Sequence, residues 1–419
     1  MNEVESILKR AFHEDNSTLL REALARYPEI KQRINDPLGP FDSPLINSAR
    51  SRQMLDAMLE AGADINAKSR WWAGGFCLLD CAADELAEYA IQRGAVVGIH
   101  AAARLGLMDR LRELVTKNPD VVHARGGDGK TPLHFARSIE VAKFLIDHGA
   151  DINARDIDHE STPAQHLIEE RPNVVRFLVS QGAETDIFIA AALGELELAK
   201  EHLRLDPECI RGRVDAENFP MANPRAGGTI YNWTLGWYVS PHQVARKFGH
   251  DNLLRWLMEQ SPPEVKLVNA CWLGDAQQVD ALLSENPTIA ESLSQGESVQ
   301  LAHAARNNDL PAVSAMLRAG LPVDCRGQLG GTPLHWAAWH GNAEMVKALL
   351  AHKAPLDILD VDNQAPPLGW AIHGSENGWH RESGDYAATV EALLKAGAKA
   401  PAKPAGTAEV KSVLAKWGS

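Results

Sequence analysis

The sequence contains no long apolar run. No stretch approaches the roughly 20 apolar residues that a membrane-spanning helix needs. The first segment, MNEVESILKRAFHEDN, is charged throughout and lacks the apolar core of a signal peptide. These absences argue against a membrane protein, and we expect a cytoplasmic protein without a membrane partner.

Cysteine is scarce and scattered, which argues against a disulfide framework. Two cysteines lie four residues apart, but no second pair accompanies them, so a zinc site is not indicated. We expect small buried side chains in a reducing compartment, with no metal and no cofactor. The five positions are Cys77, Cys81, Cys209, Cys271 and Cys325.

Basic segments are also missing. The chain has 42 Lys and Arg against 55 Asp and Glu, a formal net charge of −13, and no local run of basic residues. Such a negative field disfavours nucleic acid as a partner. Hydrophobic residues make up 45% of the sequence and charged residues 23%, which is a globular composition. A chain of 419 residues exceeds one ordinary core, so several domains or a repeat array are expected.

A repeat is visible at a period of about 33 residues. DGKTPLHFARSIEVAKFLIDHGADINARD spans 128–156, and GGTPLHWAAWHGNAEMVKALLAHKAPLDILD spans 330–360. Weaker copies begin at Ser43, Ser161 and Ser240. A second kind of unit lacks TPLH and has a proline just after its second helix; its copies begin near Ser6, at Ile99, Ile187 and Val265. We count about twelve units in all.

The recurring TPLH, the glycine after the first helix, the second helix ending in LL and the GADIN segment together resemble the ankyrin repeat family, in the form of a bacterial-type array. The resemblance covers nearly the whole chain. It implies an all-α solenoid of about twelve helix-turn-helix units with projecting loops, and a protein or peptide as partner. We expect the array over 1–399, with insertions at 211–238 and 374–386, and a linker and C-terminal capping helix over 400–419. We expect a monomer.

Elementary helix chemistry agrees with this assignment. Thr332 is a good N-cap, and Pro333 stands at the first helical position, where its missing N–H is not needed. Leu334, Ala337 and Ala338 form an apolar stripe that one unit alone cannot bury. The resemblance makes His335 structural, bonded to backbone near the loop.

A second face of the same helix carries large rings. Trp336, Trp339 and His340 are spaced i, i+3 and i+4, and by resemblance this face lines a concave groove, so we expect partial exposure. The repeat period predicts that Trp336 lies beside Trp370 and Trp339 beside His373. Neighbouring units add three more groove residues: Trp272, His303 and Arg306.

Three segments break the period, and such breaks are places to look for function. The loop 67–76 carries Trp71 and Trp72, which either cover a helix end or form an anchoring site. The insertion 211–238 is rich in Gly, Pro and Asn and includes Trp233 and Trp237; we expect an elongated loop or hairpin over the groove. The insertion 374–386 includes Trp379, Arg381 and Tyr386 and separates the two helices of the last full unit.

These features lead us to expect a non-catalytic scaffold that binds a protein or peptide on the Trp- and His-rich groove. The rings could instead form a second core under the inserted loops. An alternative from another class is a site that binds or hydrolyses a small molecule or carbohydrate, enclosed by the two insertions. No familiar catalytic motif is present. If the site were enzymatic, its candidate residues would be His373, Glu376, His380, Glu382 and Asp385.

Overall fold

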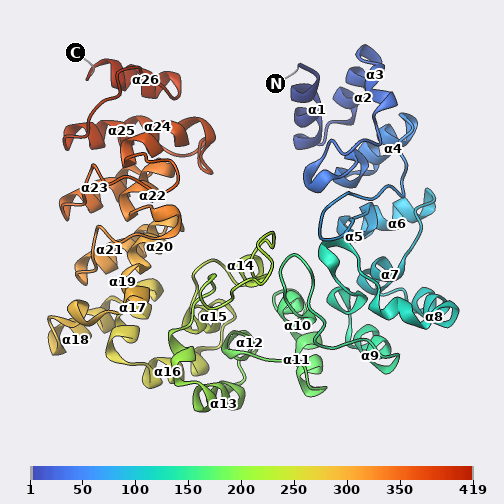
Figure 1. Ribbon diagram of the computed structural model, residues 1–419, viewed down its shortest axis with the longest axis horizontal. Helices are drawn as coiled ribbons and strands as arrows, with labels where there is room; N and C mark the ends of the chain where they lie inside the picture. Colours follow the sequence, from blue (N-terminus) through green and yellow to red (C-terminus); the bar gives the residue numbers. More distant parts are fainter. Residues whose placement is uncertain (1–2, 418–419) are drawn as a thin grey trace. The chain divides into compact units, whose positions relative to one another are not determined.

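A computed structural model describes residues 3–417, and these residues form helices and connecting segments without a β-strand. The chain divides into two compact units, residues 1–239 (unit 1) and 240–419 (unit 2). Within each unit, successive pairs of helices stack side by side (Figure 1). The predicted all-α solenoid is therefore confirmed. Among the described helices, none has the length and apolarity to cross a bilayer.

Unit 1 contains seven helix pairs with short 3-10 segments between them. The pairs are α1 (Glu3–His13) and α2 (Ser17–Arg26), η2 (Leu45–Ser48) and α4 (Arg52–Glu60), α5 (Leu78–Cys81) and α6 (Asp84–Gln92), α7 (Ile99–Leu105) and α8 (Met108–Lys117), η5 (Pro132–Phe135) and α9 (Ile139–Asp147), α10 (Pro163–Leu167) and α11 (Pro172–Ser180), and α12 (Ile187–Leu193) and α13 (Leu196–Leu205). The remaining short helices are α3 (Glu29–Gln32), η1 (Pro40–Asp42), η3 (Pro119–His123), η4 (Gly127–Gly129), η6 (Pro207–Arg211) and α14 (Tyr231–Thr234).

Unit 2 contains five helix pairs and one terminal helix. The pairs are α15 (Pro241–Lys247) and α16 (Asp251–Gln260), α17 (Pro263–Leu273) and α18 (Ala276–Glu285), α20 (Gln300–Arg306) and α21 (Leu310–Arg318), α22 (Pro333–Trp339) and α23 (Ala343–Ala351), and α24 (Pro367–Asn377) and α25 (Tyr386–Lys395). The others are η7 (Ile289–Ser292), α19 (Gln295–Ser298), η8 (Gln328–Gly330) and α26 (Ala408–Ala415). Helix α26 packs on α25, but the division into 1–399 and 400–419 stays a prediction.

The helix ends follow from the local sequence. Several first helices begin with a hydroxyl residue followed by proline, as at Thr332 and Ser240. The Ser240 side chain accepts the Gln243 N–H, and proline suits the first helical position because its missing N–H is not needed there. In units that lack TPLH, a glycine with positive φ ends the first helix, such as Gly106 at 71° and Gly274 at 70°. Second helices begin at a polar cap, as Asn342 does for α23.

The cores are shared between neighbouring pairs. In unit 2 one continuous cluster runs from Leu267 to Leu414, and in unit 1 a cluster runs from Leu8 to Ala101. Buried alanines such as Ala337 and Ala338 let the first helices approach closely, and α22 contacts both α20 and α24. No pair closes its own core, which explains why the unit repeats.

The insertions fold differently from the expected loops. Residues 211–238 contain the short helix α14 and no hairpin strand. In the other insertion, residues 374–377 extend α24, and α25 begins at Tyr386. Only the segment between these two helices forms a loop.

The cysteines form no disulfide among the described residues. Cys271 is buried, but Cys81 is exposed, so the expectation of buried cysteines was wrong there.

Candidate functional site

A pocket of about 400 Å³ lies in unit 2 on the ring-bearing side of α22 and α24. Its volume falls in the range of small-ligand and side-chain pockets, about 300–1,000 Å³. Four of its side chains are tryptophans from three segments of the chain. The lining residues are Leu329, Trp336, Trp339, Asn363, Ala365, Gly369, Trp370, His373 and Trp379. We call this the tryptophan pocket.

The four indoles pack mostly edge to face, and one pair is stacked. Trp336 meets Trp370 nearly edge-on, with ring centroids 5.0 Å apart, and Trp339 meets Trp379 at 6.2 Å and 88°. Trp379 stacks over Trp336 at 5.9 Å and 26°. Trp339 lies 5.9 Å from His373. The predicted neighbours, Trp336 with Trp370 and Trp339 with His373, are therefore confirmed.

The expected partial exposure was wrong for Trp336 and His340, both of which are buried, and was met by Trp339. Only 2% of Trp336 and 7% of Trp370 is exposed, whereas Trp339 is half-buried and Trp379 is 56% exposed. The physical reason is mutual packing: the insertion places Trp379 over Trp336, and the repeat places Trp370 against it. The rings thus form a second core, as the alternative interpretation held, but one that retains a pocket.

The insertion is fastened to α22 by Tyr386. The Tyr386 hydroxyl donates to the carbonyl of Trp339 at 2.8 Å, and the side chain is buried. Burial raises the pKa of Tyr386 to about 12, so the hydroxyl remains a donor. The backbones come very close here, because a Cβ at Gly374 would lie 2.7 Å from the Trp339 carbonyl oxygen. This close approach holds Trp379 in place.

Basic and imidazole groups flank the outer side of the same rings. The Arg306 guanidinium lies 5.7 Å from the Trp336 ring and 5.2 Å from the Trp379 ring, and its Nε donates to Gln328 at 2.6 Å. The His340 ring lies against Trp379 and His380, and its Nε2 donates to the Arg306 carbonyl at 2.8 Å. Burial lowers the pKa of His340 to about 4, so this imidazole is neutral at pH 7.

A buried hydrogen-bond frame supports the pocket from the loop side. Asp360 accepts hydrogen bonds from the backbone N–H of Asn363 at 2.7 Å and Ala365 at 3.1 Å, and from Trp370 Nε1 at 2.8 Å. Burial opposes ionisation, but these three donors outweigh it, so the pKa of Asp360 is lowered. His335 accepts from the Thr332 N–H and donates to the Ala365 carbonyl, as its predicted structural role requires.

Two indole donors of the pocket lack such a partner. Nε1 of Trp336 and Nε1 of Trp339 are both buried, and neither finds an acceptor among the described residues. A buried donor without an acceptor costs about 1–3 kcal/mol. Because neither nitrogen has appreciable accessible surface, both donors are sealed within the ring packing and are not presented to the pocket.

Gly369 helps to explain why the pocket is open. It occupies the motif position that His335 fills in the preceding unit, since PPLGW aligns with TPLHW. Glycine inside a helix is less stable than alanine by about 1 kcal/mol. Sequence reasoning missed Gly369, Leu329, Asn363 and Asp360; the departure from TPLH was the available signal for Gly369.

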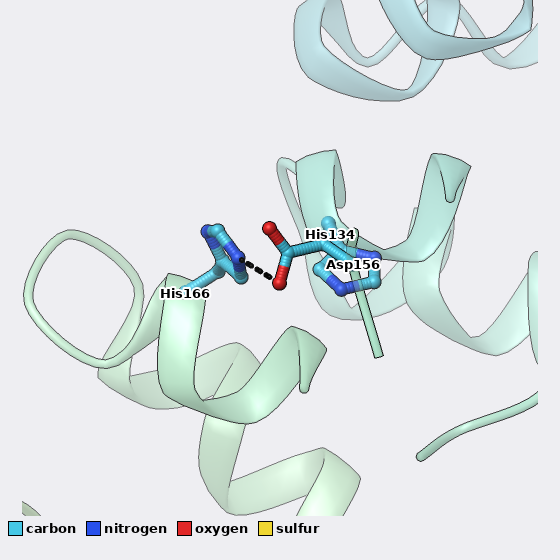
Figure 2. Close-up of side chains that lie close together, drawn as sticks. All are labelled: His134, Asp156 and His166. Carbon is cyan, nitrogen blue, oxygen red and sulfur yellow. Dashed lines mark ion pairs between the residues drawn. The ribbon is translucent and has the colours of Figure 1, made fainter. Parts of the chain in front are cut away.

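The corresponding place in unit 1 has a different chemistry. Figure 2 shows the Asp156 carboxylate facing the His166 ring, with His134 close by. Asp156 accepts from the N–H of His159 at 3.0 Å and of Ser161 at 2.7 Å, and lies 3.4 Å from His166 Nε2. Burial lowers the pKa of both His134 and His166 well below the ordinary value.

Three possible metal ligands, two imidazoles and one carboxylate, meet in this cluster. His134 and Asp156 already have hydrogen-bond partners, whereas His166 Nε2 has only its 3.4 Å contact with Asp156. His134 accepts from the Thr131 N–H and donates to the Ser161 carbonyl, as His335 does in unit 2. Trp370, which cannot bind a metal, takes the position of His166 there. The cluster is therefore explained as the hydrogen-bond frame of the repeat.

A second group of possible ligands lies beside it. Asp128, Asp158 and His159 bring one ligand atom each within 4.8 Å of one another. The Lys130 ammonium lies 3.1 Å from Asp128 and offsets its charge. His159 Nδ1 donates to the Gly228 carbonyl at 2.8 Å. A cation would have to displace Lys130, so the arrangement favours an internal ion-pair network.

The insertion 211–238 covers this network. Glu160 accepts from the N–H groups of Ala222 and Asn223, and Trp233 packs on His159 at 4.8 Å while remaining 52% exposed. At its other end, Tyr231 donates to Asp186 at 2.8 Å.

The other predicted binding residues lie outside the tryptophan pocket. Trp72 stacks with Arg225 of the insertion at 4.5 Å, and Trp71 packs on Phe41. Trp237 lies 5.8 Å from Trp233. In unit 2, Trp272 and His303 are buried, and Trp272 Nε1 donates to Gln300.

The candidate catalytic residues are not brought together. Glu376, Glu382 and Asp385 are exposed, and none lines the tryptophan pocket. Asp385 caps α25 by accepting from the Ala388 N–H, and Glu382 lies 3.7 Å from Arg381. Of the proposed acid–base set, His373 alone lines the pocket.

Comparison with known proteins places the chain in one family. A family profile described as "Ankyrin repeats (3 copies)" matches residues 99–189, 267–362 and 301–403. The probable E3 ubiquitin-protein ligase XBOS32 of Oryza sativa subsp. japonica is 33% identical over 26% of this chain and 22% of its own length. The B-cell lymphoma 3 protein homolog of Mus musculus is 24% identical over 57% of this chain and 47% of its own. The chain thus spans less than half the length of these curated relatives.

Among solved structures, the human ASB11 ankyrin repeat domain matches 73% of this chain and 99% of that domain, with 18% identity and a TM-score of 0.28. The family profile covers more than half of the sequence, including both units. The chain belongs to the ankyrin repeat family.

Proposed function

We propose that this chain is a non-catalytic binding protein whose tryptophan pocket receives a segment of a protein partner. Ankyrin repeats serve generally in protein–protein interaction, and the pocket gives that role a location. The observation that carries the proposal is a hollow of about 400 Å³ walled by four tryptophans. Tryptophan is among the residues that contribute most to binding energy at interfaces.

The absence of carboxylates from the described lining is the main support for a non-catalytic role. Hydrolysis of a sugar would need two carboxyl groups on either side of the bond that breaks. Glu376, Glu382 and Asp385 instead lie in exposed positions, where the ordinary interpretation is a solvated surface.

A small neutral molecule is the second candidate, because the pocket volume also fits such ligands. The insertion 374–386 contributes Trp379 to the pocket wall. Arg381, which could hold an anionic ligand, is exposed and lies outside the lining. Any small ligand would therefore be held mainly by stacking and apolar contact with the indoles.

A peptide selection tests the proposal. A random peptide library displayed on phage would be selected against the full chain and against Gly369→Leu, whose side chain fills the pocket. A Cβ at Gly369 meets only Ala365 and Pro366, at 3.3 and 3.5 Å, so the helix should tolerate the change. Gly296→Leu is the matched control, since nothing lies within 4 Å of a Cβ there.

Peptides that bind the wild type and Gly296→Leu but not Gly369→Leu would support the proposal. If every selected peptide binds Gly369→Leu equally well, the tryptophan pocket is not the partner site and the proposal fails. Circular dichroism and urea unfolding of both variants would verify that each retains the helical array.

A further inference from the structure

The tryptophan pocket opens onto an apolar rim. Leu329 and Trp379, two of its lining residues, are 41% and 56% exposed, and Val361, whose N–H donates to the Leu329 carbonyl, is 62% exposed. Exposed apolar side chains that adjoin one another are typical of a binding surface. A partner segment that fills the pocket therefore also covers this rim, and the part of its backbone that lies there loses contact with water.

The pocket walls offer few hydrogen bonds to an occupant. The indole nitrogens of Trp336 and Trp339 are sealed within the ring packing. Apart from the exposed indole of Trp379, the described lining contributes only two polar side chains, Asn363 and His373. The occupant must therefore be held mainly by apolar contact.

The backbone beside the pocket is also closed to an extended partner segment. The N–H groups of Gly331, Val361 and Ala365 all donate within the chain. The carbonyls of the same three residues accept hydrogen bonds from within the chain. These residues thus offer no donor for the strand-like pairing by which extended peptides bind a sheet edge. An extended segment would bury unpaired N–H groups on the apolar rim, which is unfavourable.

Two acidic side chains beside the pocket have no ion-pair partner among the described residues. Asp362 directly precedes the lining residue Asn363, and Glu376 lies one turn after His373 on the same face of α24. Both acids are exposed. They are therefore available to a basic partner.

The arginines near the pocket, by contrast, already have partners within the chain. These pairs are Arg306 with Gln328, Arg326 with the Leu359 carbonyl, and Arg381 with Glu382. The unpaired charge beside the pocket is thus negative, as is the formal net charge of −13 of the whole chain. This charge favours a partner segment with basic flanks.

We propose that the tryptophan pocket receives one face of an amphipathic α-helix of the partner, with lysine or arginine on the flanks of that face. A helix pairs its backbone N–H and C=O groups internally, so it covers an apolar rim without leaving them unsatisfied. Its apolar side chains at i, i+3, i+4 and i+7 form the stripe that enters the pocket. This inference rests on the proposed function, because it specifies the partner segment that the pocket receives.

Two phage libraries of peptides of about 18 residues, long enough for a stable helix, separate helical from extended binding. In the first, apolar residues vary at i, i+3, i+4 and i+7 of a sequence rich in alanine and lysine. In the second, they vary at alternate positions of a sequence rich in threonine and lysine, which favours a strand. We expect the first library alone to yield clones that bind the wild type and Gly296→Leu but not Gly369→Leu.

A synthetic peptide from the strongest clone tests the bound conformation. Circular dichroism should show that its helicity rises on binding, and proline at its centre should abolish binding because proline breaks the helix. The indole signal of Trp379, assigned in ¹⁵N NMR with Trp379→Phe, should shift in the complex.

The charge requirement is tested separately in the double variant Asp362→Asn, Glu376→Gln. Isothermal titration should show affinity for the lysine-rich peptide about 3- to 10-fold weaker than that of the wild type, with a smaller difference at high salt. The same peptide with glutamate in place of lysine should bind the wild type more weakly. If the double variant binds as tightly as the wild type, the requirement for basic flanks is overturned.

The outcomes distinguish this inference from the proposed function. If the pocket-dependent clones come from the alternating library, or if the bound peptide is not helical, the helix assignment is wrong and the partner site stands. If helical clones bind Gly369→Leu as well as the wild type, the inference is overturned because the binding lies elsewhere. If neither these libraries nor the random library yields a pocket-dependent peptide, both proposals are overturned.

Discussion

The two covered sites differ in the side chains that stand on the same backbone frame. In unit 1 the Ile157 N–H bonds the Asp128 carbonyl and the Asp156 N–H bonds the Ser161 carbonyl. In unit 2 the corresponding bonds join Val361 to Leu329 and Asp360 to Ala365. The backbone of the two sites is therefore built alike.

Two of three side chains on that frame change from polar in unit 1 to apolar in unit 2, and the third is polar in both. Asp128, His159 and His166 in unit 1 correspond to Leu329, Asn363 and Trp370 in unit 2. The polar set is covered by the insertion 211–238 through hydrogen bonds to its backbone, as His159 to Gly228 shows. The apolar set is covered by a stacked indole and keeps its hollow. The comparison teaches that a few side chains decide whether a repeat covered by an insertion contains a hydrogen-bonded polar cluster or a pocket.

The largest expected loss of stability comes from removing the buried aromatic ring of unit 2. Trp336→Ala removes a ring that is only 2% exposed, and we expect a loss of ~3–5 kcal/mol in the free energy of unfolding. Phe135→Ala, at the equivalent position of unit 1, should cost less, about 1–2 kcal/mol, because that ring is half-buried. Urea unfolding measures both. Equal losses would show that the ring is no more deeply packed in unit 2.

The shared frame predicts matched losses from the two aspartates. Asp360→Ala leaves three buried donors unsatisfied, and Asp156→Ala leaves two backbone N–H groups and the contact to His166. We expect ~2–4 kcal/mol for each. Asparagine at either position is the control, since it keeps the shape and one acceptor. A loss confined to one unit would contradict the common frame.

Acid should weaken both units through buried neutral histidines. Burial lowers the pKa of His340 to about 4 from an ordinary value of 6.5. The unfolded chain therefore takes up its proton first, and stability falls as the pH drops from about 6.5 to 4, by on the order of 1–3 kcal/mol. In His340→Gln, the midpoint of urea unfolding should depend less on pH over this range. In unit 1, burial also lowers the pKa of His134 and His166 well below 6.5, so these two imidazoles should weaken unit 1 in the same direction as the pH falls.

The smallest effects should come from the covering tryptophans. Trp379→Ala and Trp233→Ala each remove a ring that is about half exposed, so we expect losses below ~1 kcal/mol. Their local consequences should differ. Hydrogen exchange of the Trp336 indole N–H should speed up in Trp379→Ala, because that ring is its cover. Trp233→Ala should leave the His159 bond to Gly228 intact, which NMR of the imidazole would report.

The sequence was sufficient to predict features that depend on a local motif or on the repeat period. TPLH predicted the caps at Thr332 and the structural role of His335, and the period predicted that Trp336 meets Trp370. It missed the burial of Trp336, because the covering ring belongs to an insertion that the repeat does not position. It also missed Asp156 and Asp360, whose carboxylates look like ordinary loop residues until their backbone donors are seen.

The insertion in unit 1 has a consequence for how that unit folds. Repeat arrays contact mainly their neighbours, so their stability is close to a sum of local terms and segments can melt one by one. Here Arg225 stacks on Trp72, His159 bonds Gly228 across 69 residues of sequence, and Tyr231 bonds Asp186. Such ties between distant repeats slow chain closure. They also make partial melting from one end less favourable, so unit 1 should unfold with higher cooperativity than a simple ladder of repeats.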